Sequence, residues 1–310
     1  MRCPAYLSLF KNLLRIIGAA LLVAGLQGCG ALRLAYNQAP LATYWYLDDY
    51  IDFNAAQRPL MKTALNDIHD WHRQTQLPLY IETLQKLQSH MPTDISATQA
   101  CDLYAEVQER LLVSFEGMAG RLTMGQASGM QVIVSLDTAQ LSHLEKKFAK
   151  NNAKYRKDFV DGPAAKMHEK RLDQAISRAE MLYGNLTHKQ EALLDARLDE
   201  SGFDGNTAYA ERLRRQQDLL QTLRLLTRTP ASTMPTHMDA PNAANSLVSV
   251  LTNMAISPDL SYRNYSQKTR LQFCQTFADL HNSMSPEQRL KALDKLRGYE
   301  QDLRVLMRQP

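Results

Sequence analysis

Apolar residues recur at spacings of three and four along most of the chain, the period of a helix that packs one face against its neighbours. Leu141, Leu144 and Phe148 follow this pattern, and so do Leu293 and Leu296. No segment shows the sustained alternation of half-buried strands, and the short run 132–134 comes nearest. The pattern predicts an all-α protein, an elongated multi-helix bundle with one lobe or two.

Five segments carry the signature of a helix start, a capping residue followed three positions later by glutamine. The cap oxygen accepts a hydrogen bond from a free backbone N–H, and the glutamine accepts one from the N–H of the cap. The pairs are Asn54 with Gln57, Ser96 with Gln99, Asp137 with Gln140, Thr187 with Gln190, and Ser285 with Gln288.

Two stretches interrupt the helical pattern. Range 117–130 contains four glycines, each of which costs a helix up to about 1 kcal/mol relative to alanine, so we expect a kink or loop there. Range 230–241 is rich in Thr, Ser, Pro and Ala and predicts an exposed loop or a subdomain boundary.

The N-terminus is typical of a secreted protein. Three basic residues and no acidic residue precede Cys29, and an apolar run spans 16–26. This run is shorter than the roughly 20 residues that a membrane span needs, and it suits the hydrophobic region of a signal peptide. The alternative is a plain N-terminal anchor helix.

The segment Leu26-Gln27-Gly28-Cys29 resembles the bacterial lipobox. The resemblance implies cleavage between Gly28 and Cys29 and acyl chains such as palmitate on Cys29, and several chains on one residue anchor a protein stably. We therefore expect a signal peptide (1–28), a lipidated tether (29–40) and a helical domain (41–310). Gly30, where aspartate would favour the inner membrane, predicts an outer-membrane protein facing the periplasm, rather than one at the inner membrane or cell surface.

Charge argues against nucleic acid as a partner. The chain has 36 Lys+Arg and 32 Asp+Glu, a formal charge of +4, and loss of the leader makes it nearly neutral. Basic residues concentrate in 146–157 and 212–228. They are either solvated helix faces or contacts with an anionic membrane surface.

Cys101 and Cys274 remain after Cys3 leaves with the leader and Cys29 is lipidated. In an oxidising compartment the simple prediction is a Cys101–Cys274 disulfide. The alternative is two buried free thiols, because sequence alone cannot show that the side chains meet.

Aromatic and acidic residues interleave soon after the tether. Tyr44, Trp45, Asp48, Asp49 and Asp52 form a candidate binding surface for a protein partner or a glycan. The alternative is that the aromatic rings belong to the core and the acids face water.

His69 and His72 share one face of the predicted helix and are weak candidates for a zinc or copper site. The alternative is that both side chains make ordinary hydrogen bonds. We find no catalytic or phosphate-binding motif and expect no cofactor.

Several segments resemble one family of proteobacterial lipoproteins whose domain has no known function. The resemblance covers the mature chain and implies a helical envelope lipoprotein without an assigned activity. A weaker resemblance, carried by Leu186-Thr187-His188-Lys189-Gln190, is to the small Spy-like periplasmic chaperones. The main segments are 33–37, 45–50, 71–78, 148–152, 209–218 and 296–300.

These observations favour a lipid-anchored, non-enzymatic helical protein that binds an envelope partner or client. The alternatives are a chaperone-like envelope stress protein and a metal-binding enzyme that uses His69 and His72.

Overall fold

The computed structural model describes residues 30–123, 127–228 and 240–309, and these residues form thirteen helices and no strand. The predicted all-α, multi-helix bundle is therefore confirmed. The predicted signal peptide and Cys29 lie outside the described residues. The helices are α2 (Ala31–Asn37), α3 (Ala39–Ile51), α4 (Gln57–Thr75), α5 (Leu77–His90), α6 (Ala97–Thr123), α7 (Ser128–Val134), α8 (Thr138–Phe159), α9 (Ala164–Tyr183), α10 (His188–Asp199), α11 (Gly205–Arg228), α12 (Ala240–Ala255), α13 (Leu260–Asn282) and α14 (Pro286–Met307).

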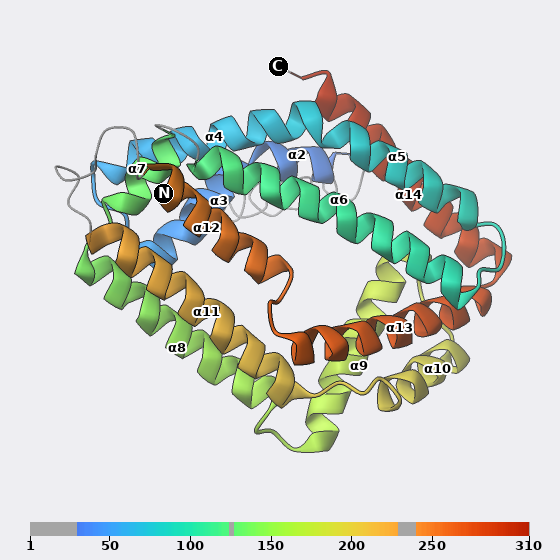
Figure 1. Ribbon diagram of the computed structural model, residues 1–310. Helices are drawn as coiled ribbons and strands as arrows, with labels where there is room; N and C mark the ends of the chain where they lie inside the picture. Colours follow the sequence, from blue (N-terminus) through green and yellow to red (C-terminus); the bar gives the residue numbers. More distant parts are fainter. Residues whose placement is uncertain (1–29, 124–126, 229–239, 310) are drawn as a thin grey trace, which may run out of the picture.

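The helices follow one another around a closed circuit (Figure 1). The most extensive contact joins α5 to α14, and α6 contacts both α12 and α13. On the opposite side of the circuit α8 and α11 pack together. Within the described ranges, no helix is long and apolar enough to cross a membrane.

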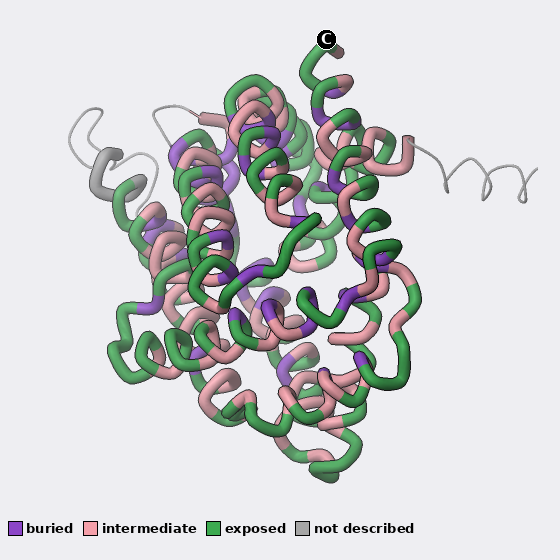
Figure 2. Tube along the Cα trace, turned by 90° about the vertical axis from the view of Figure 1, so that its right-hand side faces the viewer, coloured by how far each residue is buried: buried purple, intermediate pink, exposed green. Residues whose placement is uncertain are grey.

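Buried residues are spread along the helices and not gathered at one end (Figure 2). The largest apolar cluster joins α3, α4, α7, α8, α11 and α12, and a second joins the end of α5 to α9, α10, α13 and α14. A third cluster consists of Leu77 and Ile81 of α5 with Leu303 and Leu306 of α14. The last helix therefore completes two of the clusters.

The expected subdomain boundary at 230–241 lies almost wholly outside the described residues. The helices on either side of it, α11 and α12, pack against each other. Leu223 and Leu226 of α11 and Leu247 of α12 belong to the same apolar cluster.

The reciprocal capping bonds form at all five expected helix starts. Four of the glutamines are also buried and meet in pairs, Gln57 with Gln140 and Gln190 with Gln288. The fifth, Gln99, is exposed. The capping residues thus start helices and, at four sites, join one helix start to another.

A helix occupies much of the segment that we expected to be a tether. Residues 31–37 form α2, which packs on α14. Arg33 makes an ion pair with Asp302 at 3.0 Å, and the Tyr36 hydroxyl lies 2.9 Å from Nδ1 of His72. This segment is part of the folded body because side chains of α14 and α4 hold it by these two polar contacts.

The expected kink over 117–130 is wrong for its first part, because α6 continues through Gly117 and Gly120 to Thr123. A β-carbon on Gly117 would lie 2.3 Å from the ring of Trp71. Glycine therefore allows α4 and α6 to approach closely at this ring. Residues 124–126 lie outside the described residues.

Cys101 of α6 and Cys274 of α13, the two cysteines that we expected to pair, are joined by a disulfide with a Cα–Cα distance of 5.2 Å. The bond links residues 173 positions apart. It lies in a small buried cluster with Ile95, Ala100 and Ala278.

Candidate functional site

The helix α3 exposes two aromatic side chains, Trp45 and Tyr46, and Trp45 borders a shallow depression. Trp45 is 60% exposed and Tyr46 is 62% exposed. The depression has a volume of about 360 Å³. Its lining consists of Trp45, Asp48, Asp49, Asp52 and His143. We call these five residues and Tyr46 the α3 surface.

Two of the three carboxylates of the α3 surface, those of Asp48 and Asp49, are held in place by neighbouring groups. Asp48 accepts a hydrogen bond from the backbone N–H of Phe53 at 2.9 Å. A hydrogen bond from Lys147 holds the pKa of Asp49 below its usual value, so Asp49 is a carboxylate at neutral pH. His143, which sequence reasoning did not include, donates from Nε2 to the backbone oxygen of Asp49 at 2.9 Å. The surface therefore presents acids whose positions are already fixed.

Tyr44 does not belong to this surface. It is 2% exposed, its ring stacks on Phe53 at 6.2 Å, and the Lys62 ammonium lies 4.7 Å from the ring centroid. The core alternative therefore holds for Tyr44, whereas Trp45 and the three acids line the depression together. The difference arises because successive residues of a helix point about 100° apart, so Tyr44 and Trp45 face different neighbours.

His69 and His72 make ordinary hydrogen bonds. Nε2 of His69 donates to the backbone oxygen of Tyr36 at 3.0 Å, and Nδ1 of His72 contacts the Tyr36 hydroxyl. Burial lowers the pKa of both histidines. Within the ranges that the structure describes, no group of three His, Cys, Asp or Glu side chains is arranged to hold a metal ion. The pair is thus accounted for as a polar contact between α2 and α4.

The basic residues of α8 and α11 divide into two groups. Arg214 and Arg215 both pair with the buried carboxylate of Glu211, which also accepts a hydrogen bond from Ser257. These cations hold α11 to the end of α12. By contrast, three exposed lysines of α8 make no ion pair with any described residue, and they are Lys146, Lys150 and Lys154.

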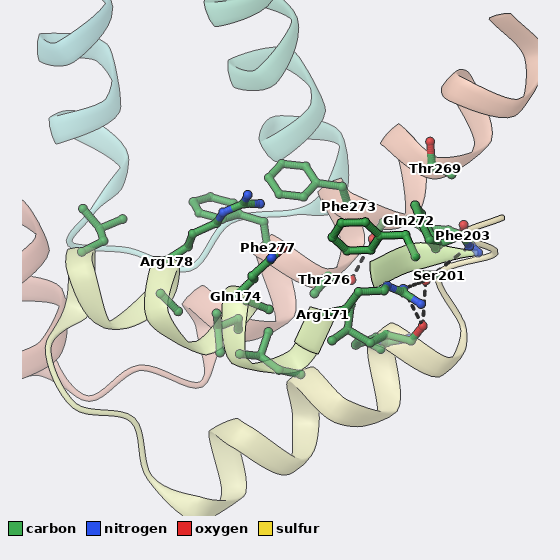
Figure 3. Close-up of a pocket in the computed structure, with 18 of the residues that line it drawn as sticks. Arg171, Gln174, Arg178, Ser201, Phe203, Thr269, Gln272, Phe273, Thr276 and Phe277 are labelled. Atoms are coloured by element: carbon green, nitrogen blue, oxygen red, sulfur yellow. Dashed lines mark hydrogen bonds between the residues drawn. The ribbon is translucent and has the colours of Figure 1, made fainter. Parts of the chain in front are cut away.

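An apolar pocket lies between α9, α10 and α13 (Figure 3). Its volume is about 600 Å³, within the range of roughly 300–1,000 Å³ that is common for small-molecule sites. Phe203 and Phe273 line it although they are 37% and 51% exposed. The helix α9 contributes the small side chains of Ala175 and Ala179 to the lining.

Arg171 lies at one end of this pocket. Its Nη2 donates to the backbone oxygen of Leu198 at 3.3 Å and to Oγ of Ser201 at 2.5 Å. Its guanidinium lies 4.5 Å from the centroid of Phe203, and burial lowers its pKa. Sequence reasoning missed the pocket because α13 lies far from α9 and α10 in the chain, and the pattern of one helix does not show which residues of another helix it faces.

No curated protein and no solved structure matches this sequence. Residues 49–243, more than half of the chain, match a family of unknown function. This match includes Asp49 and Asp52 of the α3 surface, both histidines and most of the apolar pocket, but it begins after Trp45 and Asp48 and stops before α13. The chain belongs to the family of unknown function DUF6279.

Proposed function

We propose that the protein is a lipid-anchored, non-enzymatic helical protein of the bacterial envelope that binds an envelope protein through its α3 surface. The observation that carries this proposal is the exposure of Trp45 and Tyr46 beside acids that are fixed in place. An exposed tryptophan next to an exposed tyrosine is costly to leave in water, and both residues are enriched among those that dominate binding energy at interfaces.

The fixed acids support the choice of a protein partner. Because Asp48 and Asp49 already have hydrogen-bond or ion-pair partners, a ligand that docks here does not have to immobilise them. Their negative charge suits a partner with basic residues around an apolar centre. It also disfavours direct contact of this surface with an anionic lipid layer.

The proposed location in the cell follows from the N-terminal sequence. The basic leader, the short apolar run and the Leu26-Gln27-Gly28-Cys29 box together favour cleavage before Cys29 and lipidation of that residue. Gly30 favours the outer membrane, with the folded body in the periplasm. The α3 surface begins shortly after the anchor, so a partner bound there would lie close to the membrane.

The test is site-specific photo-crosslinking in intact cells, with a photoreactive residue in place of Trp45. Met181 on α9 is a matched control position because it is 62% exposed and belongs to neither the α3 surface nor the apolar pocket. We expect one envelope protein to crosslink from position 45 and not from position 181, and the crosslink to be lost in Cys29→Ala.

Two results would contradict the proposal. Equal crosslinking from positions 45 and 181 would show that the α3 surface has no special role. Weak crosslinks from both positions to many unrelated proteins would instead favour the chaperone-like alternative.

A further inference from the structure

The apolar pocket changes in character along its length. Toward one end its lining includes Arg171, Ser201, Thr269 and Gln272, all of which carry hydrogen-bonding side chains. Toward the other end α9, α10 and α13 contribute the aliphatic side chains of Ala179, Leu182, Leu194 and Leu280, and Arg178 and Arg197 lie among them in the lining. Figure 3 shows Arg171 with Ser201, Gln272 and Phe203 grouped on one side of the pocket.

The chain direction of the three helices produces this polarity. Along α13 the lining changes from Thr269 and Gln272 to Phe277 and Leu280. Along α9 it runs from Arg171 to Leu182 with Arg178 between them, whereas from α10 into the next turn it runs from Leu194 to Ser201. A hydrogen bond between the Tyr183 hydroxyl and Nδ1 of His281 holds the C-terminal ends of α9 and α13 side by side. Gln272 reaches the backbone oxygen of Glu200 and fixes the polar ends.

Arg171 retains unused donors at the polar end. Both of its hydrogen bonds to described residues come from Nη2, and it makes no ion pair with a described carboxylate. Its Nε and Nη1 groups thus remain for an anion, each as a separate hydrogen-bond donor, because both paired edges of a guanidinium include Nη2. Phe203 stacks on the guanidinium and limits its movement.

We propose that this pocket binds a long-chain fatty acid, with the carboxylate hydrogen-bonded to Nη1 of Arg171 and the acyl chain along the aliphatic side chains. Three arginines line the pocket, but Arg197 is paired with Glu200 and Asp279, and Arg178 is exposed. Arg171, grouped with the polar residues at one end, therefore matches one anionic headgroup, and the apolar side chains match one acyl chain. The volume of about 600 Å³ is that of a small-molecule site and not of a protein interface. The proposal does not depend on the α3 surface or on the lipid anchor.

The first test measures displacement of a fluorescent fatty acid by palmitate, with the chain from Gly30 onward, which contains every described helix. We expect saturable binding of one palmitate per chain. Hexadecanol should bind at least about tenfold more weakly, because a hydrogen bond to a charged group contributes about 1.5–3 kcal/mol. Octanoate should also bind more weakly, because each buried CH₂ contributes about 0.8 kcal/mol.

Two variants locate the site. Arg171→Gln should weaken palmitate binding about tenfold and leave hexadecanol binding nearly unchanged, whereas Arg263→Gln, an exposed arginine of α13 outside the pocket, should change neither. Ala175→Trp should abolish binding of both by filling the cavity. Thermal unfolding of each variant shows whether it is folded, and the comparison of palmitate with hexadecanol on the unmodified chain needs no variant.

Equal affinity for palmitate and hexadecanol would overturn the proposal, and so would unchanged binding in folded Ala175→Trp. Displacement of the probe by a lysophospholipid but not by palmitate would also overturn it, because the anion on Arg171 would then be a phosphate.

Discussion

Gln190 and Gln288 hold each other by two hydrogen bonds, in which each side-chain nitrogen donates to the other side-chain oxygen, at 2.9 and 3.0 Å. Each oxygen also accepts from the backbone N–H of its own capping residue, Thr187 or Ser285. Each nitrogen also donates to a backbone oxygen in the opposite turn. We call this arrangement a glutamine clasp, and Gln57 with Gln140 forms a second one at the starts of α4 and α8.

Loss of one clasp glutamine should be more costly than loss of an ordinary capping glutamine. Gln190→Ala leaves the buried amide of Gln288 without its partner, and an unsatisfied buried polar group costs about 1–3 kcal/mol. Gln99→Ala is the matched control because Gln99 makes the same capping bonds but is exposed, and it should cost about 1 kcal/mol or less. Urea unfolding of the two variants measures the difference, and equal losses would show that the clasp adds nothing.

The disulfide between Cys101 and Cys274 should stabilise the fold substantially. It closes a loop of 173 positions, for which chain-entropy models give about 5 kcal/mol and experiments often give less. The double variant Cys101→Ala, Cys274→Ala should therefore unfold at lower urea concentration, with a loss of about 2–5 kcal/mol. Addition of a reductant should lower the stability of the unmodified chain and leave that of the double variant unchanged. Detection of two free thiols in the oxidised, denatured chain would contradict this prediction.

Two glycine-to-alanine substitutions should change the stability of the fold in opposite directions. Gly117→Ala places a β-carbon 2.3 Å from the Trp71 ring, and such overpacking typically costs about 1–3 kcal/mol. Gly298→Ala in α14 meets nothing within 4 Å, so the higher helix propensity of alanine should stabilise the protein by about 0.5–1 kcal/mol. Thermal unfolding of both variants tests the pair, and stabilisation by Gly117→Ala would refute the close packing of α4 on α6.

Stability should fall as the pH decreases from about 7 to about 5, the range in which unfolded histidine takes up a proton near 6.5. Burial lowers the pKa of His69, His72 and His281 in the folded protein. The unfolded chain therefore binds protons more readily than the folded chain, and protonation favours unfolding in this range. Carboxylates whose pKa is lowered add their effect only at lower pH.

Substitution at His281 tests the origin of that pH dependence. This side chain is fully buried and donates from Nε2 to the backbone oxygen of Thr93 at 2.9 Å. His281→Gln should reduce the change in unfolding free energy between the two pH values, whereas His188→Gln removes an exposed histidine as a matched control. An undiminished change in His281→Gln would assign the effect to other groups.

Local signals predicted the helices well because they act within a few residues. The cap at Ser285 and the glutamine at 288 needed no information from elsewhere to define the start of α14. The sequence did not reveal that Gln288 faces Gln190, because that contact depends on how two helices pack. The continuation of α6 through Gly117 was missed for the same reason, since the Trp71 ring that requires the glycine lies on another helix.

The candidate sites show the same difference between features set by nearby residues and features set by contacts between distant helices. Most residues that line the α3 surface lie close together in the chain, so their sequence pattern predicted most of the surface. The burial of Tyr44 and the contribution of His143 from α8 were missed. Arg171 and Phe277 become neighbours in one pocket only after three helices have assembled. No short sequence motif predicts such a pocket.

The contact between α5 and α14 has a consequence for the order of folding. Leu77 and Ile81 are buried by Leu303 and Leu306, more than two hundred positions later in the chain. A chain that emerges N-terminus first therefore leaves this apolar face of α5 in water until its last two turns have appeared. Such long-range contacts slow folding, because a large loop must close before they form. A nascent chain halted before α14 would expose a ready binding site for chaperones and proteases, whereas the completed chain would conceal it.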